Sequence, residues 1–94
     1  GFKVIDMGVD VTPEKFVETA KSNPGAFVAM SALLTTTMPS MGKTIQALKE
    51  AGLKTRTVIG GAPTTQEFAD EIGATVYAAD PTTAIEKIKA ILAA

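Results

Sequence analysis

The chain has 94 residues, the length of one small domain. With 46% hydrophobic and 20% charged residues it can form a core, which argues against a disordered segment. A net charge of −1, scattered lysines and 5% aromatic residues argue against nucleic-acid binding. Cysteine and histidine are both absent, so the chain has no disulfides, no thiolate chemistry and no imidazole for a metal or a proton.

No apolar stretch approaches the roughly 20 residues that a membrane helix needs, and no signal peptide is recognisable at the start. We therefore expect a cytoplasmic domain without a membrane partner.

Four short apolar runs predict four strands, and a helical pattern follows each of them. The predicted strands are residues 2–7, 26–30, 57–59 and 74–78. The predicted helices begin at Thr12-Pro13, near Pro39, at Thr64 and at Asp80-Pro81. Strands separated by helices of this length predict crossovers and a parallel sheet. The expected fold is an α/β, Rossmann-like (flavodoxin-like) three-layer sandwich of four parallel strands and four helices, with residues 1–94 as one domain.

Details of the pattern place individual elements. The run 2–7 contains polar residues and is expected near a sheet edge, whereas the run 26–30 is wholly apolar and is expected in the middle. Thr64 and Glu67 have the spacing of a capping box. The apolar positions expected to face the core from the last helix are Ala84, Ile85, Ile88, Ile91 and Leu92.

In open parallel sheets, ligands bind beyond the carboxyl ends of the strands. Those ends are expected at Gly8–Asp10, Ser31–Thr37, Gly60–Thr65 and Tyr77–Asp80. They are rich in small and hydroxyl-bearing residues and offer no nucleophile–base pair. This composition favours a surface that holds a ligand over one that performs acid–base chemistry.

Each of these features also has a structural interpretation. Gly60-Gly61 fits a tight turn as well as the close approach of a ligand or of another backbone. The hydroxyl residues in 31–37 fit helix capping equally well. Asp10 and Asp80 are more often helix caps than ligand contacts, and Tyr77 is more often half-buried core.

Four segments together resemble the cobalamin (vitamin B12) binding domain of corrinoid proteins, in particular the methyl carriers of methanol and methylamine methyltransferase systems. They are GFKVIDMGVDVTPEKFVETAK, SALLTTTMPSM, VIGGAPTTQEFADEIGA and YAADPTTAI. The family signature is Asp-x-His-x-x-Gly, then Ser-x-Leu, then Gly-Gly. Ser31-Ala32-Leu33 and Gly60-Gly61 match the second and third parts in order and spacing. The first part, with the histidine that replaces the dimethylbenzimidazole base below cobalt, is expected upstream of Gly1.

The resemblance implies a corrinoid cofactor and a site at the carboxyl ends of the strands. The nucleotide tail of the cofactor would enter a slot between the sheet and the helices. By resemblance, the cofactor-binding residues are Val9, Asp10, Ser31, Leu33, Thr35, Thr36, Gly60, Gly61, Ala62, Tyr77, Ala79 and Asp80. No residue of this chain is expected to be catalytic or to ligate the metal. The implied partners are cobalamin-dependent methyltransferase subunits, and the implied role is that of a carrier component without catalysis of its own.

The family's first strand–helix unit is absent from this sequence, and that strand lies mid-sheet in the order 2-1-3-4-5. Unpaired buried backbone is costly, so the gap between the runs 2–7 and 26–30 cannot remain empty. We expect that the two strands pair with each other, or that a second copy completes the sheet as a homodimer; completion by another segment is a third outcome.

The sequence leaves two other functional classes open. The chain could be a truncated or designed α/β fragment with only a structural role, which a cobalamin titration would distinguish from a binding domain. A hydrolase or transferase that uses the same loops would need a partner chain to supply a histidine.

Overall fold

Strands and helices alternate along the whole chain. The computed structural model describes residues 3–9, 11–32 and 38–93. The elements are β1 (Val4–Val9), α1 (Pro13–Ser22), β2 (Phe27–Ser31), α2 (Met38–Glu50), β3 (Arg56–Gly60), α3 (Gln66–Ile72), β4 (Val76–Tyr77) and α4 (Pro81–Ala93). Their number and order confirm the predicted pattern, with bounds shifted by a few residues.

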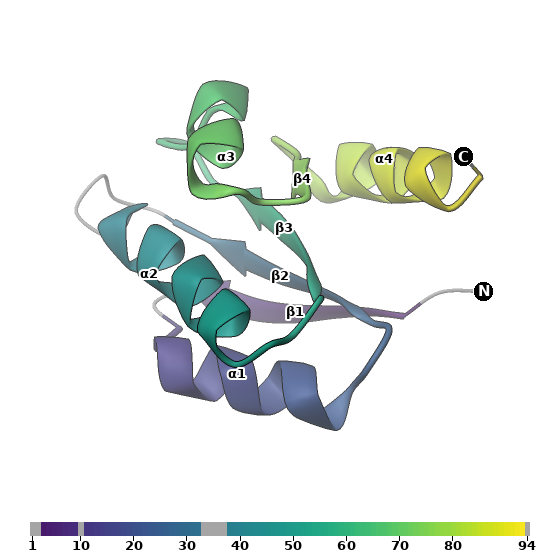
Figure 1. Ribbon diagram of the computed structural model, residues 1–94. Coiled ribbons are helices and arrows are strands. Elements are labelled where there is room, and N and C mark those ends of the chain that lie inside the picture. The colour runs from purple at the N-terminus through teal and green to yellow at the C-terminus, as the bar shows by residue number, and fades with distance from the viewer. Residues whose placement is uncertain (1–2, 10, 33–37, 94) are drawn as a thin grey trace.

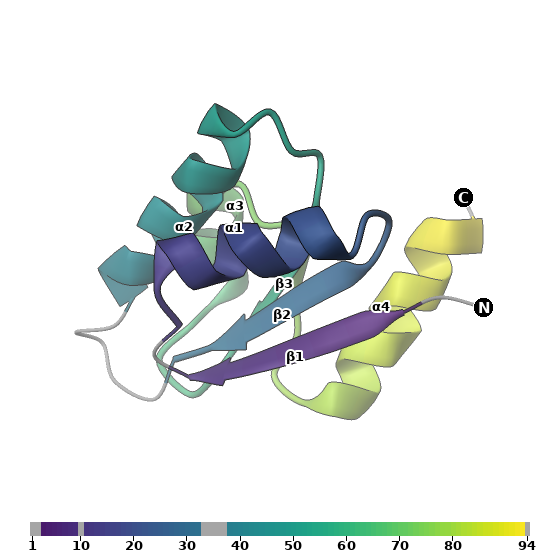
Figure 2. The same ribbon diagram turned by 90° about the horizontal axis from the view of Figure 1, so that it is seen from below.

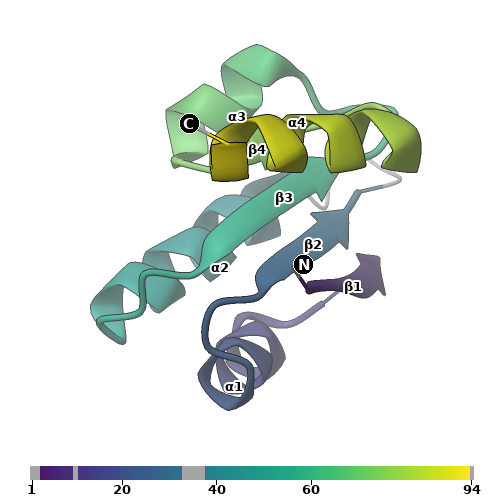
Figure 3. The same cartoon turned by 90° about the vertical axis from the view of Figure 1, so that its right-hand side faces the viewer.

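The strands form a single parallel sheet in the order β1-β2-β3-β4 (Figures 1 and 3). The polar run is an edge strand and the wholly apolar run is an inner strand, as predicted. β1 pairs directly with β2, through Val4 with Phe27 and Asp6 with Ala29. Of the three outcomes considered for the sheet, the structure shows the first, in which the two strands close on each other.

Helices cover the two faces of the sheet unequally. One core cluster includes Phe16, Val28, Met41 and Ala69 and joins α1, α2 and α3 to one face of the sheet. A smaller cluster of Phe27, Val58, Val76 and Ile88 joins only α4 to the other face. Figures 2 and 3 show α4 on the opposite side of the sheet from α1 and α2. The predicted three-layer sandwich is therefore confirmed.

Right-handed crossovers explain this distribution. The strands are added in one direction across the sheet, so each right-handed β-α-β connection places its helix on the same face. No strand follows α4 in the described chain, so no crossover fixes its side. The face opposite α1, α2 and α3 would otherwise expose the apolar side chains of β2 and β3, and α4 buries part of that surface.

The ends of the helices follow the local sequence. Thr12 caps α1 by accepting a hydrogen bond from the Lys15 amide at 3.3 Å. Gly73 ends α3 in the left-handed conformation, with φ of 83°. The predicted capping box at Thr64 is wrong by one residue. Thr65 is the N-cap and accepts from the Phe68 amide, while Thr64 donates its hydroxyl to the Gly61 carbonyl at 2.7 Å and is buried.

The core face of α4 is narrower than predicted. Ile88 is buried, and Ala84 and Ile91 pack against the same cluster. Ile85 and Leu92 are each 45% exposed, which contradicts the expectation that they face the core. Ile85 and Leu92 are seven residues apart and so lie on the same side of the apolar stripe of α4, and the sheet covers the other side of that stripe.

Gly60 and Gly61 lie where three backbones converge at the end of β3. A Cβ atom on Gly60 would lie 2.7 Å from the carbonyl oxygen of Ala78. A Cβ on Gly61 would overlap the backbone of Ala32, and Gly61 also has φ of 108°, which side chains disfavour. Two of the interpretations left open from sequence hold here: Gly61 begins a turn in which the Thr64 amide donates to its carbonyl at 3.0 Å, and another backbone lies close to each glycine.

Gly61→Ala is therefore expected to destabilise the fold strongly. The new methyl group would overlap Ala32, and the positive φ would add strain, for a combined loss of about 3 kcal/mol or more in the free energy of unfolding. Urea denaturation followed by circular dichroism measures this loss.

Gly52→Ala is the matched control. Gly52 also has a positive φ, of 74°, but a Cβ there would meet no atom within 4 Å. It is expected to cost only about 1 kcal/mol. Equal losses in the two variants would contradict the argument from close approach.

Candidate ligand groove

The uneven covering of the sheet leaves a groove beside α4. Its volume is about 500 Å³, and it runs over β1, β2 and β3 towards the carboxyl ends of the strands. The residues that line it are Val4, Asp6, Ala29, Met30, Ser31, Val58, Ile59, Gly60, Gly61, Ala78, Ala79, Asp80, Ala84, Ile85 and Ile88.

The alternation of side chains along β2 determines what the groove presents. Val28, Met30 and Ala32 belong to the cluster beneath α1, α2 and α3, whereas Phe27 and Ala29 pack on the α4 side. Ser31 follows the same alternation and therefore lies on the α4 side. The groove thus has a floor of small or aliphatic side chains with one hydroxyl at the end of the strand.

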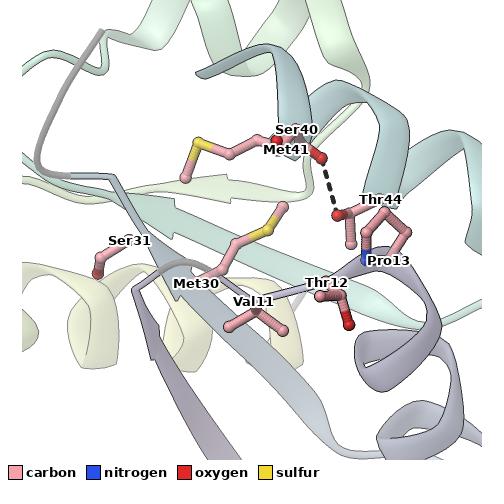
Figure 4. A pocket seen from close by; sticks show the side chains of 8 residues that line it. All are labelled: Val11, Thr12, Pro13, Met30, Ser31, Ser40, Met41 and Thr44. Atoms are coloured by element: carbon pink, nitrogen blue, oxygen red, sulfur yellow. Dashed lines mark hydrogen bonds between the residues drawn. The ribbon is translucent and has the colours of Figure 1, made fainter. Parts of the chain in front are cut away.

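The Ser31 hydroxyl is available for a ligand. Figure 4 shows this side chain pointing away from Met30 and Met41. Within the described part of the chain it has no hydrogen-bond partner, and the residue is half-buried. A hydroxyl can donate or accept, so it can satisfy one polar atom of a ligand that lies against the apolar floor.

The two carboxylates that line the groove already accept hydrogen bonds. Asp6 accepts from the Gly8 amide at 2.8 Å. Asp80 accepts from the Thr83 amide at 2.8 Å and from the Thr83 hydroxyl at 3.1 Å. These bonds from Thr83, the backbone one first, lower the pKa of Asp80. Asp80 is thus a helix cap of α4, the structural interpretation that the sequence favoured, and it also lies at the mouth of the groove.

The structure brings together five of the twelve residues predicted to bind cofactor: Ser31, Gly60, Gly61, Ala79 and Asp80. For all twelve, direct contact with cofactor stays a prediction.

The remaining predicted residues lie elsewhere or are not described. Val9 is at the end of β1, paired with Ser31 through the backbone. Ala62 is exposed in the turn after β3 and does not line the groove. Tyr77 packs against the cluster on the other face of the sheet, and the Lys87 ammonium donates to its carbonyl oxygen at 2.6 Å. Asp10, Leu33, Thr35 and Thr36 lie outside the described residues.

Several groove residues were not predicted from sequence. They are the wall and floor positions on β1, β2, β3 and α4, among them Val4, Asp6, Ala29, Val58 and Ala84. The period-two alternation outward from Ser31 on β2 is a signal that could have found Ala29. Nothing in the sequence alone showed that α4 would leave this part of the sheet uncovered.

A second, smaller hollow of about 250 Å³ lies on the other side of Ser31 (Figure 4). Met30 and Met41 line it and are both buried, and Thr44 donates its hydroxyl to the Ser40 carbonyl at 2.8 Å. These methionines act as packing residues, in agreement with their place in the core cluster.

In residues 3–9, 11–32 and 38–93 there is no group of three or more His, Cys, Asp or Glu side chains that could hold a metal ion. No helix in these ranges has the length and hydrophobicity to cross a membrane.

A parallel α/β domain with a groove at the carboxyl ends of its strands belongs to the class of open-sheet ligand-binding domains. Comparison with known families identifies it further. The family model for the B12 binding domain matches residues 1–89. The chain therefore belongs to the B12-binding domain family, as its loops indicated.

Similar proteins with known names agree with this family. Trimethylamine corrinoid protein 1 of Methanosarcina mazei is 47% identical over 94 residues, which cover 98% of this chain and 44% of that protein. Dimethylamine corrinoid protein 3 of the same organism is 46% identical over 95 residues, covering 99% of this chain and 57% of that protein. The chain thus spans about half the length of the relatives it matches.

Two solved structures have the same fold. The monomethylamine corrinoid protein of Methanosarcina barkeri superimposes with a TM-score of 0.85 at 33% identity, covering 97% of this chain and 45% of that one. A cobalamin-binding protein of Desulfitobacterium hafniense gives 0.82 at 30% identity, covering 95% and 44%. These likenesses confirm the Rossmann-like architecture.

The cap at Asp80 predicts a contribution to stability that depends on pH. Its pKa is lowered in the folded state, so the contribution is present above the unfolded-state pKa of about 3.9. It should be lost as the pH falls through the lower, folded-state pKa. Asp80→Asn should therefore show a weaker loss of stability than the unaltered chain between about pH 5 and pH 2 in urea titrations.

Asp70→Asn is the matched control, because Asp70 is an exposed carboxylate on α3 whose hydrogen bond comes from the Gln66 side chain and caps no helix. It should leave the acid dependence close to that of the unaltered chain. The same acid dependence in Asp80→Asn and in the unaltered chain would contradict a stabilising cap at Asp80.

Proposed function

We propose that this chain is the corrinoid-binding part of a methyl-carrier protein, and that the groove beside α4 receives the nucleotide tail of the cofactor. The main support for the proposal is that Ser31, Gly60 and Gly61 line the same groove of about 500 Å³. These residues match two separate parts of the family signature. Ligand pockets in proteins commonly measure about 300–1,000 Å³ and have mostly apolar walls with a few polar groups.

The residues present fit a nucleotide tail. The small side chains of Ala29, Ala78 and Ala84 leave space for a flat base beside α4, and Ser31 offers one hydroxyl. The glycines at the end of β3 keep Cβ atoms out of the crowded end of the groove. We also propose that the cofactor contacts Val9, at the end of β1, and Asp10, Leu33, Thr35 and Thr36.

Cobalt coordination is a separate matter. The sequence contains no histidine, so this chain cannot supply an imidazole to the metal from below. When bound, a corrinoid supplies a cobalt centre that can carry a methyl group. In our proposal the chain holds and orients that cofactor, and no side chain of its own takes part in the transfer.

The proposed partners follow from the relatives. Their names describe corrinoid proteins for trimethylamine and dimethylamine, and we propose that this chain likewise serves a methyltransferase acting on a methylated amine. Family membership makes the alternative, a structural fragment without a cofactor, the less favoured one. The cytoplasmic location expected from the sequence stays a prediction.

The structure removes the reason for which a homodimer was expected. It was expected to fill a gap between β1 and β2, and these strands pair directly. The oligomeric state stays a prediction, and light scattering on the purified chain distinguishes one copy from two.

Binding is tested with dicyanocobalamin, in which cyanide occupies both axial positions of cobalt and leaves the tail base free. This form suits a chain that has no histidine to displace the base. We expect retention of the cofactor in equilibrium dialysis. Ala84→Leu should weaken binding about tenfold or more, because the larger side chain fills the groove beside α4.

Ala90→Leu is the matched control. Ala90 is exposed on the same helix and does not line the groove, so its variant should bind as the unaltered chain does. Both substitutions keep a good helix former. Absence of retention, or equal weakening by the two variants, would contradict the proposal.

A further inference from the structure

In the part of the chain that the structure describes, backbone polar groups at the floor of the groove are hydrogen-bonded within the protein. The Ala32 amide donates to the Gly60 carbonyl, and the Ala78 amide donates to the Ile59 carbonyl, both at 3.1 Å. The described side chains on the floor from β2 and β3 are aliphatic, apart from Ser31. Among the described residues, a base lying on this floor therefore finds one side-chain hydroxyl with which to form a hydrogen bond, that of Ser31.

The carboxylates that line the groove do not add a hydrogen-bond partner on its floor. Asp6 and Asp80 are both exposed, so they remain hydrated. Asp6 already accepts from the Gly8 amide, and both oxygens of Asp80 accept from Thr83. They border the groove without providing a desolvated acceptor on its floor.

We infer that the groove selects corrinoids by the base of their tail and favours a benzimidazole over a purine. This inference rests on the proposed function. A benzimidazole joined to ribose keeps one free ring nitrogen, which the Ser31 hydroxyl can satisfy. An adenine adds two further ring nitrogens and an exocyclic amine, which must give up water on an aliphatic floor. Buried polar groups without partners lower affinity substantially.

The selectivity is measured as a ratio of dissociation constants. We compare three ligands in their dicyano forms, in which the tail base is free of cobalt: cobalamin, the same corrinoid with an adenine tail, and cobinamide, which has no tail base. Cobalamin should bind about tenfold or more tightly than the adenine form, as one or two unsatisfied polar groups imply. It should also bind more tightly than cobinamide.

The outcomes separate the inference from the proposed function. If none of the three ligands binds, the proposed function fails. If cobalamin and the adenine form bind equally, the proposed function stands and the inferred selectivity is overturned. If cobalamin and cobinamide bind equally, corrinoid binding stands, but the base lies outside the groove, which overturns both the inference and the proposed placement of the tail beside α4.

A pair of variants tests whether the floor is responsible. Val58→Thr adds a hydroxyl to the groove floor with little change in shape and should reduce the ratio at least threefold, because the purine gains a partner. Val28→Thr makes the same change on the opposite face of the sheet and should leave the ratio unchanged. A ratio compares ligands on the same folded molecules, so a loss of stability common to both variants does not alter it. Equal ratios in the two variants would overturn the assignment to the floor.

Discussion

The close approach of three backbone segments at the end of β3 is the contact on which the groove depends. Gly60 lies against the carbonyl of Ala78, and Gly61 lies against Ala32. The Ala32 amide donates to the Gly60 carbonyl, and Thr64 is held to Gly61 by bonds from its amide and its hydroxyl. A side chain at Gly61 would push β2 and β3 apart at the end where Ser31 is placed. The glycines thus shape the groove chiefly by letting the protein approach itself.

The groove itself results from handedness and strand order. Three right-handed crossovers in one direction place α1, α2 and α3 on one face, which leaves a single helix for the other face. One helix cannot cover four strands, so part of the floor of β1, β2 and β3 stays open beside α4. The same geometry explains why Val4 and Ile85, which line the groove, are exposed apolar residues.

The sequence predicted those features that depend on local patterns. Apolar runs and helix caps such as Thr12 located the elements, because period and capping are properties of neighbouring residues. The cap at Thr64 was misplaced because Thr65 offers the same hydroxyl one position later, and only the turn after Gly61 decides between them. Ile85 and Leu92 were wrongly predicted to be buried, because periodicity identifies the apolar side of a helix but not how much of that side the sheet covers.

The candidate site likewise has a part that the sequence predicted and a part that it could not predict. Ser31 and the glycine pair could be located from sequence because a strand end is a local feature, and strand alternation then fixes the face on which Ser31 lies. Tyr77 shows the limit of this reasoning. It also ends a strand, β4, but the alternation of side chains places its ring on the face of the sheet opposite the groove. A position at a strand end is therefore not sufficient to place a side chain in the groove. The aliphatic floor could not be inferred, because it depends on how much of the sheet α4 covers from the far end of the chain, and α4 leaves Ala29 only partly buried. Membership of the family therefore indicates which cofactor to expect, whereas in our proposal the arrangement of the floor determines which polar atoms of that cofactor can be accommodated.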